Sequence, residues 1–219
     1  MKRTKNPAKE AEYRKRAADL VAQMTLHEKV SQMLSWAPAI ERLGIPAYNW
    51  WSEGIHGVGR AGTATVFPQA IGMAAAFDED MMEQVGNAIG VEARGKYNMC
   101  RAHGDRDIFK GLTVWAPNIN IFRDPRWGRG HETYGEDPFL TSRLGVRFVE
   151  GMQGDDPDYL QAAACAKHFA VHSGPESDRH HFNAIVSKQD LWETYLPAFR
   201  ALVKEAGVEA VMGAYNRTN

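Results

Sequence analysis

The chain has 219 residues, enough to bury a sizeable core in one domain or two small ones. Its 26 Lys and Arg nearly balance its 27 Asp and Glu, and the net charge of -1 excludes a general attraction to nucleic acid or to a membrane surface. No segment approaches the roughly 18 apolar residues of a membrane span, and the basic start of the chain leads into charged residues instead of the apolar core of a signal peptide. Two cysteines, Cys100 and Cys165, are too few for a disulfide scaffold. We therefore expect a cytoplasmic protein with reduced thiols and without a nucleic-acid or membrane partner.

The first segment, residues 1–35, predicts two helices. Apolar residues recur at helical spacing over residues 13–24. Thr25 is followed three residues later by Glu28, which is the capping-box pattern at the start of a helix.

After these helices, short apolar segments alternate with helical patterns. Asp78, and Asp137 with a proline after it, are typical N-caps at the start of two further helices. We expect strands at residues 47–50, 73–77, 112–117, 162–166 and 208–215, and helices after Asp78, after Asp137 and over residues 187–206, the last kinked or restarted at Pro197.

The order of strand, loop and helix, repeated about five times, indicates a parallel α/β sheet, either doubly wound or a (β/α)8 barrel. A barrel needs eight strands, and the chain ends at Asn219 just after a predicted strand. In both architectures the functional residues lie beyond the carboxyl ends of the strands. The segments that follow those ends are residues 50–62, 118–137, 167–183 and 215–219.

Aromatic residues stand at the ends of two predicted strands. Trp50 and Trp51 precede Glu53, and such flat apolar faces beside a carboxylate suit a sugar ring and its hydroxyls. The alternative is a pair of core tryptophans with Glu53 as a cap. Tyr215 follows the last predicted strand, where its hydroxyl would face the same cleft or its ring would form part of the rim.

Residues 123–137 combine arginines and acids with Trp127, Tyr134, prolines and glycines. The interleaved aromatic, proline and glycine residues predict a fixed loop instead of a solvated run of charges. We expect ion pairs to account for most of the charges, with one arginine facing the cleft.

Lys167 and His168 end the fourth predicted strand, and further histidines follow in the next loop. A lysine and a histidine there can bind ligand hydroxyls, and Asp178 with His180 can form a proton-transfer pair. Alternatively, His168 and His172 could bind a metal together with His180 or Asp178.

Residues 50–57, 116–138 and 166–183 together resemble the amino-terminal catalytic barrel of family 3 glycoside hydrolases, the β-glucosidase and β-xylosidase group. The resemblance runs from about Leu20 to Asn219. It implies a helical segment over residues 1–35 and, over residues 36–219, an incomplete (β/α)8 TIM-type barrel with about five of its eight units.

The resemblance also implies a role for each matching residue. Glu53 matches the acidic position that holds sugar hydroxyls, and Arg129 matches a hydroxyl-binding arginine. Lys167 and His168 match the Lys-His pair of the same subsite, and Tyr215 matches the tyrosine near the nucleophile.

The implied reaction is hydrolysis of terminal, non-reducing β-D-glucosyl or β-D-xylosyl residues with retention, without a cofactor or metal. The family's nucleophile is an aspartate on the strand after the one that carries Tyr215, and its usual acid/base is a glutamate of a second domain; both are expected beyond Asn219. Removing either carboxyl group stops a double displacement. We therefore expect this chain to bind a small carbohydrate, to need the carboxy-terminal domains of its parent as partners, and to be inactive alone.

Two alternatives stay open. The related β-N-acetylhexosaminidases use a histidine with an aspartate two residues before it, a spacing that Asp178 and His180 share, but their Pro-Gly is replaced here by Ala170 and Val171. The chain could also be a non-catalytic sugar-binding fragment.

Overall fold

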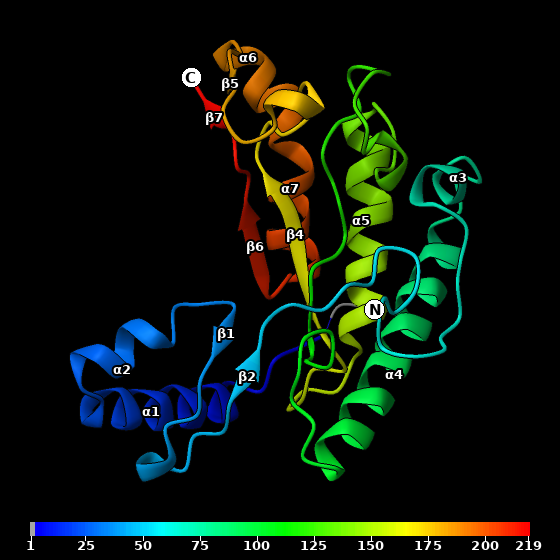
Figure 1. Ribbon diagram of the computed structural model, residues 1–219. Helices are drawn as coiled ribbons and strands as arrows, with labels where there is room; N and C mark the ends of the chain where they lie inside the picture. The colour runs from blue at the N-terminus through cyan, green and yellow to red at the C-terminus, as the bar shows by residue number, and fades with distance from the viewer. Residues whose placement is uncertain (1–2) are drawn as a thin grey trace.

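A three-stranded parallel sheet connects the middle of the chain to its end. In the computed structural model, which describes residues 3–219, strands β3 (Thr113–Val114), β4 (Ala163–Phe169) and β6 (Ala210–Gly213) pair in the order β3-β4-β6. Parallel bridges from Asn118 to Lys167 and from Ser52 to Val114 extend this pairing. Strand β4 is therefore held on both sides (Figure 1).

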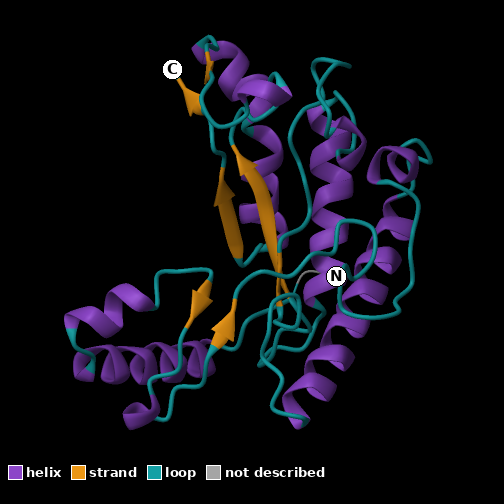
Figure 2. Ribbon diagram, in the orientation of Figure 1, coloured by secondary structure: helices purple, strands orange, loops and turns teal. Residues whose placement is uncertain are grey.

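The other elements are mainly helical, as Figure 2 shows. The remaining strands pair in two small sheets, β1 with β2 in antiparallel and β5 with β7 in parallel orientation. The elements are α1 (Pro7–Gln23), α2 (Leu26–Ser31), β1 (Trp36–Ala37), η1 (Glu41–Leu43), β2 (Tyr48–Asn49), α3 (Ala70–Ala74), α4 (Glu79–Ala102), η2 (Gly130–Glu132), α5 (Pro138–Gln153), η3 (Glu176–Asp178), β5 (Asn183–Ala184), α6 (Lys188–Asp190), η4 (Leu191–Tyr195), α7 (Pro197–Ala201), η5 (Leu202–Ala206) and β7 (Arg217–Thr218).

The helices predicted in the first 35 residues are confirmed. The Thr25 hydroxyl accepts a hydrogen bond from the Glu28 amide at 3.3 Å, and the Glu28 carboxylate accepts one from the Thr25 amide at 2.8 Å. Neither α1 nor α2 has a buried residue. In Figure 1 these helices and the β1–β2 hairpin extend away from the β4–β6 sheet.

The predicted N-caps of the two longest later helices are also confirmed. Asp78 accepts a hydrogen bond from the Met81 amide at 2.9 Å at the start of α4, and Asp137 accepts one from the Leu140 amide at 2.6 Å at the start of α5. The predicted helix over residues 187–206 is divided into α6, η4, α7 and η5, and Pro197 begins α7.

The prediction of a strand at residues 73–77 is wrong. Helix α3 ends at Ala74, so the first two residues of this segment are helical. A turn follows them before Asp78. Its apolar residues are mostly alanine and methionine, which favour helix over strand. A short apolar run does not separate a buried strand from a buried helix by its period alone.

The strand predicted at residues 47–50 is shorter than predicted, and it lies in an antiparallel sheet instead of the predicted parallel one. It forms β2, which pairs with β1 in antiparallel orientation and not with the parallel sheet. The described residues consequently form a mixed α/β fold with an open parallel sheet, and they do not close into a barrel. Cys100 and Cys165 are both free. Within residues 3–219, no helix is long and apolar enough to cross a membrane.

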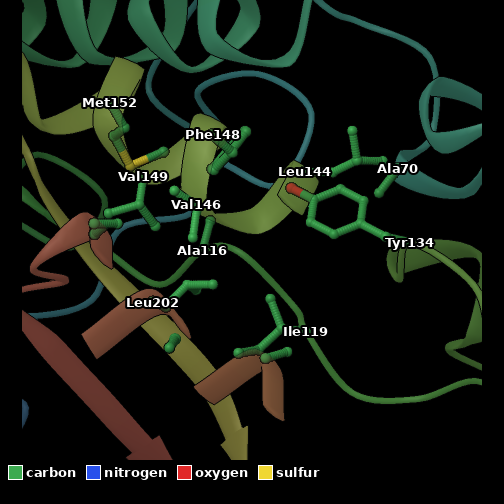
Figure 3. Packing of buried hydrophobic residues seen from close by; sticks show 14 of the residues in the cluster. Ala70, Ala116, Ile119, Tyr134, Leu144, Val146, Phe148, Val149, Met152 and Leu202 are labelled. Carbon is green, nitrogen blue, oxygen red and sulfur yellow. The ribbon is translucent and has the colours of Figure 1, made fainter. Parts of the chain in front are cut away.

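Helix α5 contributes Leu144, Val146, Phe148, Val149 and Met152 to the core. It lies beside α4 and contacts α7 and β4, and its apolar side chains pack between these elements (Figure 3). The largest of the fully buried side chains around it are Phe148, Met82, Ile89, Ile119, Leu144, Met152 and Leu202.

Glycines allow α4 and α5 to approach closely. A Cβ atom at Gly86 of α4 would collide with the carbonyl oxygen of Phe148, and one at Gly151 of α5 would collide with the carbonyl oxygen of Glu83. By contrast, a Cβ atom at Gly95, also in α4, would meet open space. The two helices are thus in backbone contact at Gly86 and Gly151.

This contact predicts opposite effects for the same substitution on one helix. Gly86→Ala should lower the free energy of unfolding by about 1–3 kcal/mol, because the helices must separate. Gly95→Ala should raise it by up to about 1 kcal/mol, because alanine loses less entropy in a helix. Urea unfolding of both variants checks this, and equal effects would contradict the close helix contact.

Candidate functional site

Lys167 is a buried charged side chain near the carboxyl end of β4. Its residue is 3% exposed, and its ammonium nitrogen lies 3.7 Å from the Glu53 carboxylate, on the loop after β2. Burial lowers the pKa of Lys167, and the Glu53 charge acts in the opposite direction. Glu53 also accepts a hydrogen bond from the Trp51 indole at 2.7 Å. The predicted residues Glu53 and Lys167 therefore meet in the structure.

Arg129 is held by a carboxylate of its own loop. Its guanidinium donates two hydrogen bonds to the Glu132 carboxylate, at 2.7 and 2.5 Å. Burial opposes ionisation of Glu132, yet these bonds hold the pKa of Glu132 below its usual value. Arg129 was the arginine expected to face the cleft, and it is itself part of an ion pair. Its orientation is set by Glu132, and its third nitrogen lies 3.3 Å from His168 Nε2.

His168 and His172 are buried, and their rings are in contact at a tilt of 38°. Their ring centroids are 4.3 Å apart, and each ring has an asparagine oxygen near its Nδ1 atom: Asn120 at 2.9 Å from His168 and Asn216 at 3.0 Å from His172. Burial lowers the pKa of both histidines, and the neighbouring Lys167 charge lowers that of His168 further. Both imidazoles are therefore neutral at neutral pH.

The structure does not bring all predicted residues to this centre. Tyr215 is 68% exposed, and its ring lies against His180 with centroids 4.6 Å apart. No hydrogen bond joins Asp178 to His180 in the described part of the chain, so these two residues do not form a proton-transfer pair here. Likewise, residues 3–219 contain no group of three or more His, Cys, Asp or Glu arranged to hold a metal ion.

The two tryptophans that precede Glu53 are on the surface. Trp50 and Trp51 are 45% and 37% exposed, so they are not a core pair. Trp51 stacks on Trp115, with centroids 4.9 Å apart and an angle of 21° between the planes. This stack places a flat aromatic surface beside Glu53, since Trp51 also donates to that carboxylate.

Sequence reasoning missed the supporting residues Asn120, Asn216 and Trp115. One signal for Asn120 was available, because it is a polar residue between Ile119 and Ile121 in an apolar run. A buried polar side chain in such a run needs hydrogen-bond partners. Its partner could not be found from spacing, because it lies 48 residues away.

Two cavities lie near the site: one is lined by Glu53 and Glu132, and the other by Trp127, whose ring contacts His172. One of about 200 Å³ is lined by Glu53 and Glu132 together with His56, Gln69 and His131. A second, of about 520 Å³, is lined by residues of the 123–127, 173–176 and 182–185 segments. The carboxylates of the two ion pairs therefore face an open space.

Comparison with known proteins identifies the family of the chain. Residues 16–219 match the Glycosyl hydrolase family 3 N terminal domain. A xylan 1,4-beta-xylosidase of Xylanibacter ruminicola is 52% identical over 208 residues, which are 93% of this chain and 24% of that protein. A probable beta-D-xylosidase 7 of Arabidopsis thaliana is 48% identical over 94% of this chain and 28% of that protein.

Solved structures give the same result. A GH3 exo-beta-xylosidase (XlnD), in complex with a xylobiose aziridine activity-based probe, is 36% identical with a TM-score of 0.83, over 93% of this chain and 27% of that one. DesR, a beta-glucosidase from Streptomyces venezuelae in complex with D-glucose, is 35% identical with a TM-score of 0.76, over 93% of this chain and 25% of that one. The chain thus spans about a quarter of the length of these proteins. It belongs to glycosyl hydrolase family 3, and it matches that family's N-terminal domain.

Proposed function

We propose that this chain supplies the sugar-binding residues of a retaining glycosidase that releases terminal, non-reducing β-D-xylosyl or β-D-glucosyl residues. The observation that carries the proposal is the convergence of Glu53, Lys167, Arg129 and His168. These side chains come from three separate segments and offer both hydrogen-bond donors and acceptors. Sugar hydroxyls need this mixture, because each hydroxyl can donate and accept.

The charges in this cluster also suit a glycosidase. Lys167 and Arg129 are cationic donors whose hydrogen bonds to hydroxyls can strengthen as the sugar ring approaches an oxocarbenium-like transition state. Each cation is oriented by a carboxylate, Glu53 or Glu132. A preorganised donor needs little rearrangement when the sugar reacts.

The xylosyl group is the better candidate for the bound sugar. Relatives named as xylosidases match this chain at 42–52% identity, whereas the solved glucosidases match it at 30–35%. D-xylose is therefore the first ligand to test, with D-glucose as its comparison.

We also propose that this chain binds sugar without hydrolysing it. A retaining double displacement needs two carboxyl groups about 5 Å apart across the scissile bond, one free to attack and one to carry a proton. Glu53 and Glu132, the carboxylates of the cluster, are both paired with cations. Pairing with Arg129 favours the ionised form of Glu132 and opposes proton donation by that carboxyl group.

Lys167→Met should weaken D-xylose binding by roughly tenfold or more, because a hydrogen bond from a charged group contributes about 1.5–3 kcal/mol. Isothermal titration of the purified chain with D-xylose measures the change. Lys15→Met is the matched control, since Lys15 pairs with Asp19 on the exposed face of α1. It should bind as the wild type does. Equal binding by the wild type and Lys167→Met would contradict the assignment of Lys167.

The pH dependence of stability gives a second test of Lys167. Because burial lowers its pKa in the folded state below the ordinary value of 10.5, the unfolded chain binds more protons between these two pKa values. Lys167 therefore makes the free energy of unfolding rise with pH in that range. Lys167→Met should lack this rise.

Urea unfolding of the wild type and Lys167→Met across this pH range measures the difference directly. Other groups titrate there as well, including Cys165, whose pKa burial raises to about 11. They are common to both proteins, so the difference reports on Lys167 and on its electrostatic coupling to Cys165. Parallel pH profiles would show that the pKa of Lys167 is not lowered in the folded state.

A further inference from the structure

The amide of Asn120 can take only one orientation. Its nitrogen lies 2.8 Å from the carbonyl oxygen of His168 and 3.1 Å from that of Ala170. Carbonyl oxygens only accept hydrogen bonds, so the NH₂ group must face them. The amide oxygen then faces the His168 backbone N–H, which donates to it at 2.9 Å. Every partner of Asn120 agrees with this orientation.

This orientation determines the hydrogen on His168 Nδ1. The same amide oxygen lies 2.9 Å from Nδ1, and an oxygen that only accepts requires Nδ1–H as the donor. On the other side of the ring, Arg129 lies 3.3 Å from Nε2. A guanidinium only donates, so Nε2 must carry a lone pair. Two independent neighbours therefore select the same tautomer.

His172 repeats the arrangement with a different asparagine. The Asn216 amide nitrogen donates to the carbonyl oxygens of Val171 and Arg217, both at 2.8 Å. Its oxygen therefore faces His172 Nδ1, at 3.0 Å. This selects Nδ1–H on His172 as well. Asn120 and Asn216 are both buried, at 2% and 8% exposure, so water does not compete for these bonds.

The surroundings oppose a positive charge on either ring. Lys167, Arg129 and Arg179 bring positive charge to His168, and the two rings are in contact. The Asn216 hydrogen bond and the Glu176 carboxylate act in the opposite direction at His172, but burial outweighs them. With both rings buried, a second proton on either one would add a cation beside existing cations.

We propose that Asn120 and Asn216 are positioning residues that hold His168 and His172 as neutral Nδ1–H tautomers, so that His168 Nε2 accepts a hydrogen bond from Arg129 and orients that guanidinium toward a sugar hydroxyl. The tautomers follow from the hydrogen bonds alone, whereas the role of Arg129 toward sugar rests on the proposed function. In this arrangement Lys167 and Arg129 donate to the ligand, and His168 orients Arg129.

Long-range ¹H–¹⁵N spectra of the chain with labelled histidines test the tautomers directly. We expect a pyrrole-type Nδ1 and a pyridine-type Nε2 for both His168 and His172 at neutral pH, with each ring titrating below an ordinary histidine. A pyrrole-type Nε2 on either ring, or a pKa at or above that of an ordinary histidine, would overturn the proposal for that histidine. The wild-type spectrum is decisive without any variant.

Matched variants separate the two pairs. Asn120→Leu keeps the approximate shape but removes the acceptor, so the Nδ1 signal of His168 should shift, while Arg129 keeps Nε2 pyridine-type and His172 keeps its spectrum. Asn216→Leu should shift the Nδ1 signal of His172 and leave that of His168 unchanged. Asn120→Asp restores an acceptor, so it should restore the hydrogen-bonded Nδ1–H signal and raise the pKa of His168 by about 1–3. If Asn120→Leu changes neither ring, Asn120 does not position His168.

Addition of D-xylose to the same sample tests the role toward sugar. His168 Nε2 should shift on binding, because its donor Arg129 contacts the sugar, and it should remain pyridine-type. A pyrrole-type Nε2 in the complex would overturn the contact with Arg129. If D-xylose causes no change anywhere in the spectrum, the proposed function fails and the role of Arg129 toward sugar falls with it, while the unliganded spectrum still decides the tautomers.

Discussion

The buried ammonium of Lys167 is the constraint on which the arrangement of the site depends. A charge at 3% exposure is costly unless an opposite charge and hydrogen-bond partners lie beside it. Lys167 cannot leave this position, because β4 pairs with β3 and β6 and Lys167 itself bridges to Asn118. The loop after β2 must therefore return to the end of β4 and place Glu53 near it. The proposed sugar-binding surface then lies next to the Trp51–Trp115 stack.

The same electrostatic condition explains why the histidines are neutral. Lys167 and Arg129 are matched by Glu53 and Glu132, so the cluster has two cations and two anions before His168 is counted. An imidazolium would add an uncompensated charge in a buried place. Neutral imidazoles have two tautomers, and only side chains with a fixed donor and acceptor can select one of them. Asparagine meets this need, whereas a carboxylate would favour the charged ring.

How much of this could be predicted from the sequence depends on how local each signal is. The helix starts at Thr25, Asp78 and Asp137 were predictable because a cap bonds to residues within the next turn. Lys167 was predictable as a site residue because polar residues at the end of a parallel strand face the functional edge. The strand at residues 73–77 was mispredicted, since a short apolar run fits helix and strand alike. The Arg129–Glu132 pair is likewise local, since its residues are three apart. The choice of Asn120 as the partner of His168 depends on the tertiary approach of loops, which composition and spacing do not encode.

The segment between β6 and β7 shows the same limit of prediction from sequence. Tyr215 resembled a site residue, yet it is exposed against His180, while the next residue, Asn216, is buried and bonded to His172. Neighbouring residues in extended chain point to opposite sides, so a shift of one position exchanges a surface residue for a site residue. Because Asn216 also bonds to the carbonyl oxygens of Val171 and Arg217, it ties the segment after β6 to the loop after β4. His172 contacts His168, so the segment between β6 and β7 supports His168 through Asn216 and His172 rather than through the tyrosine.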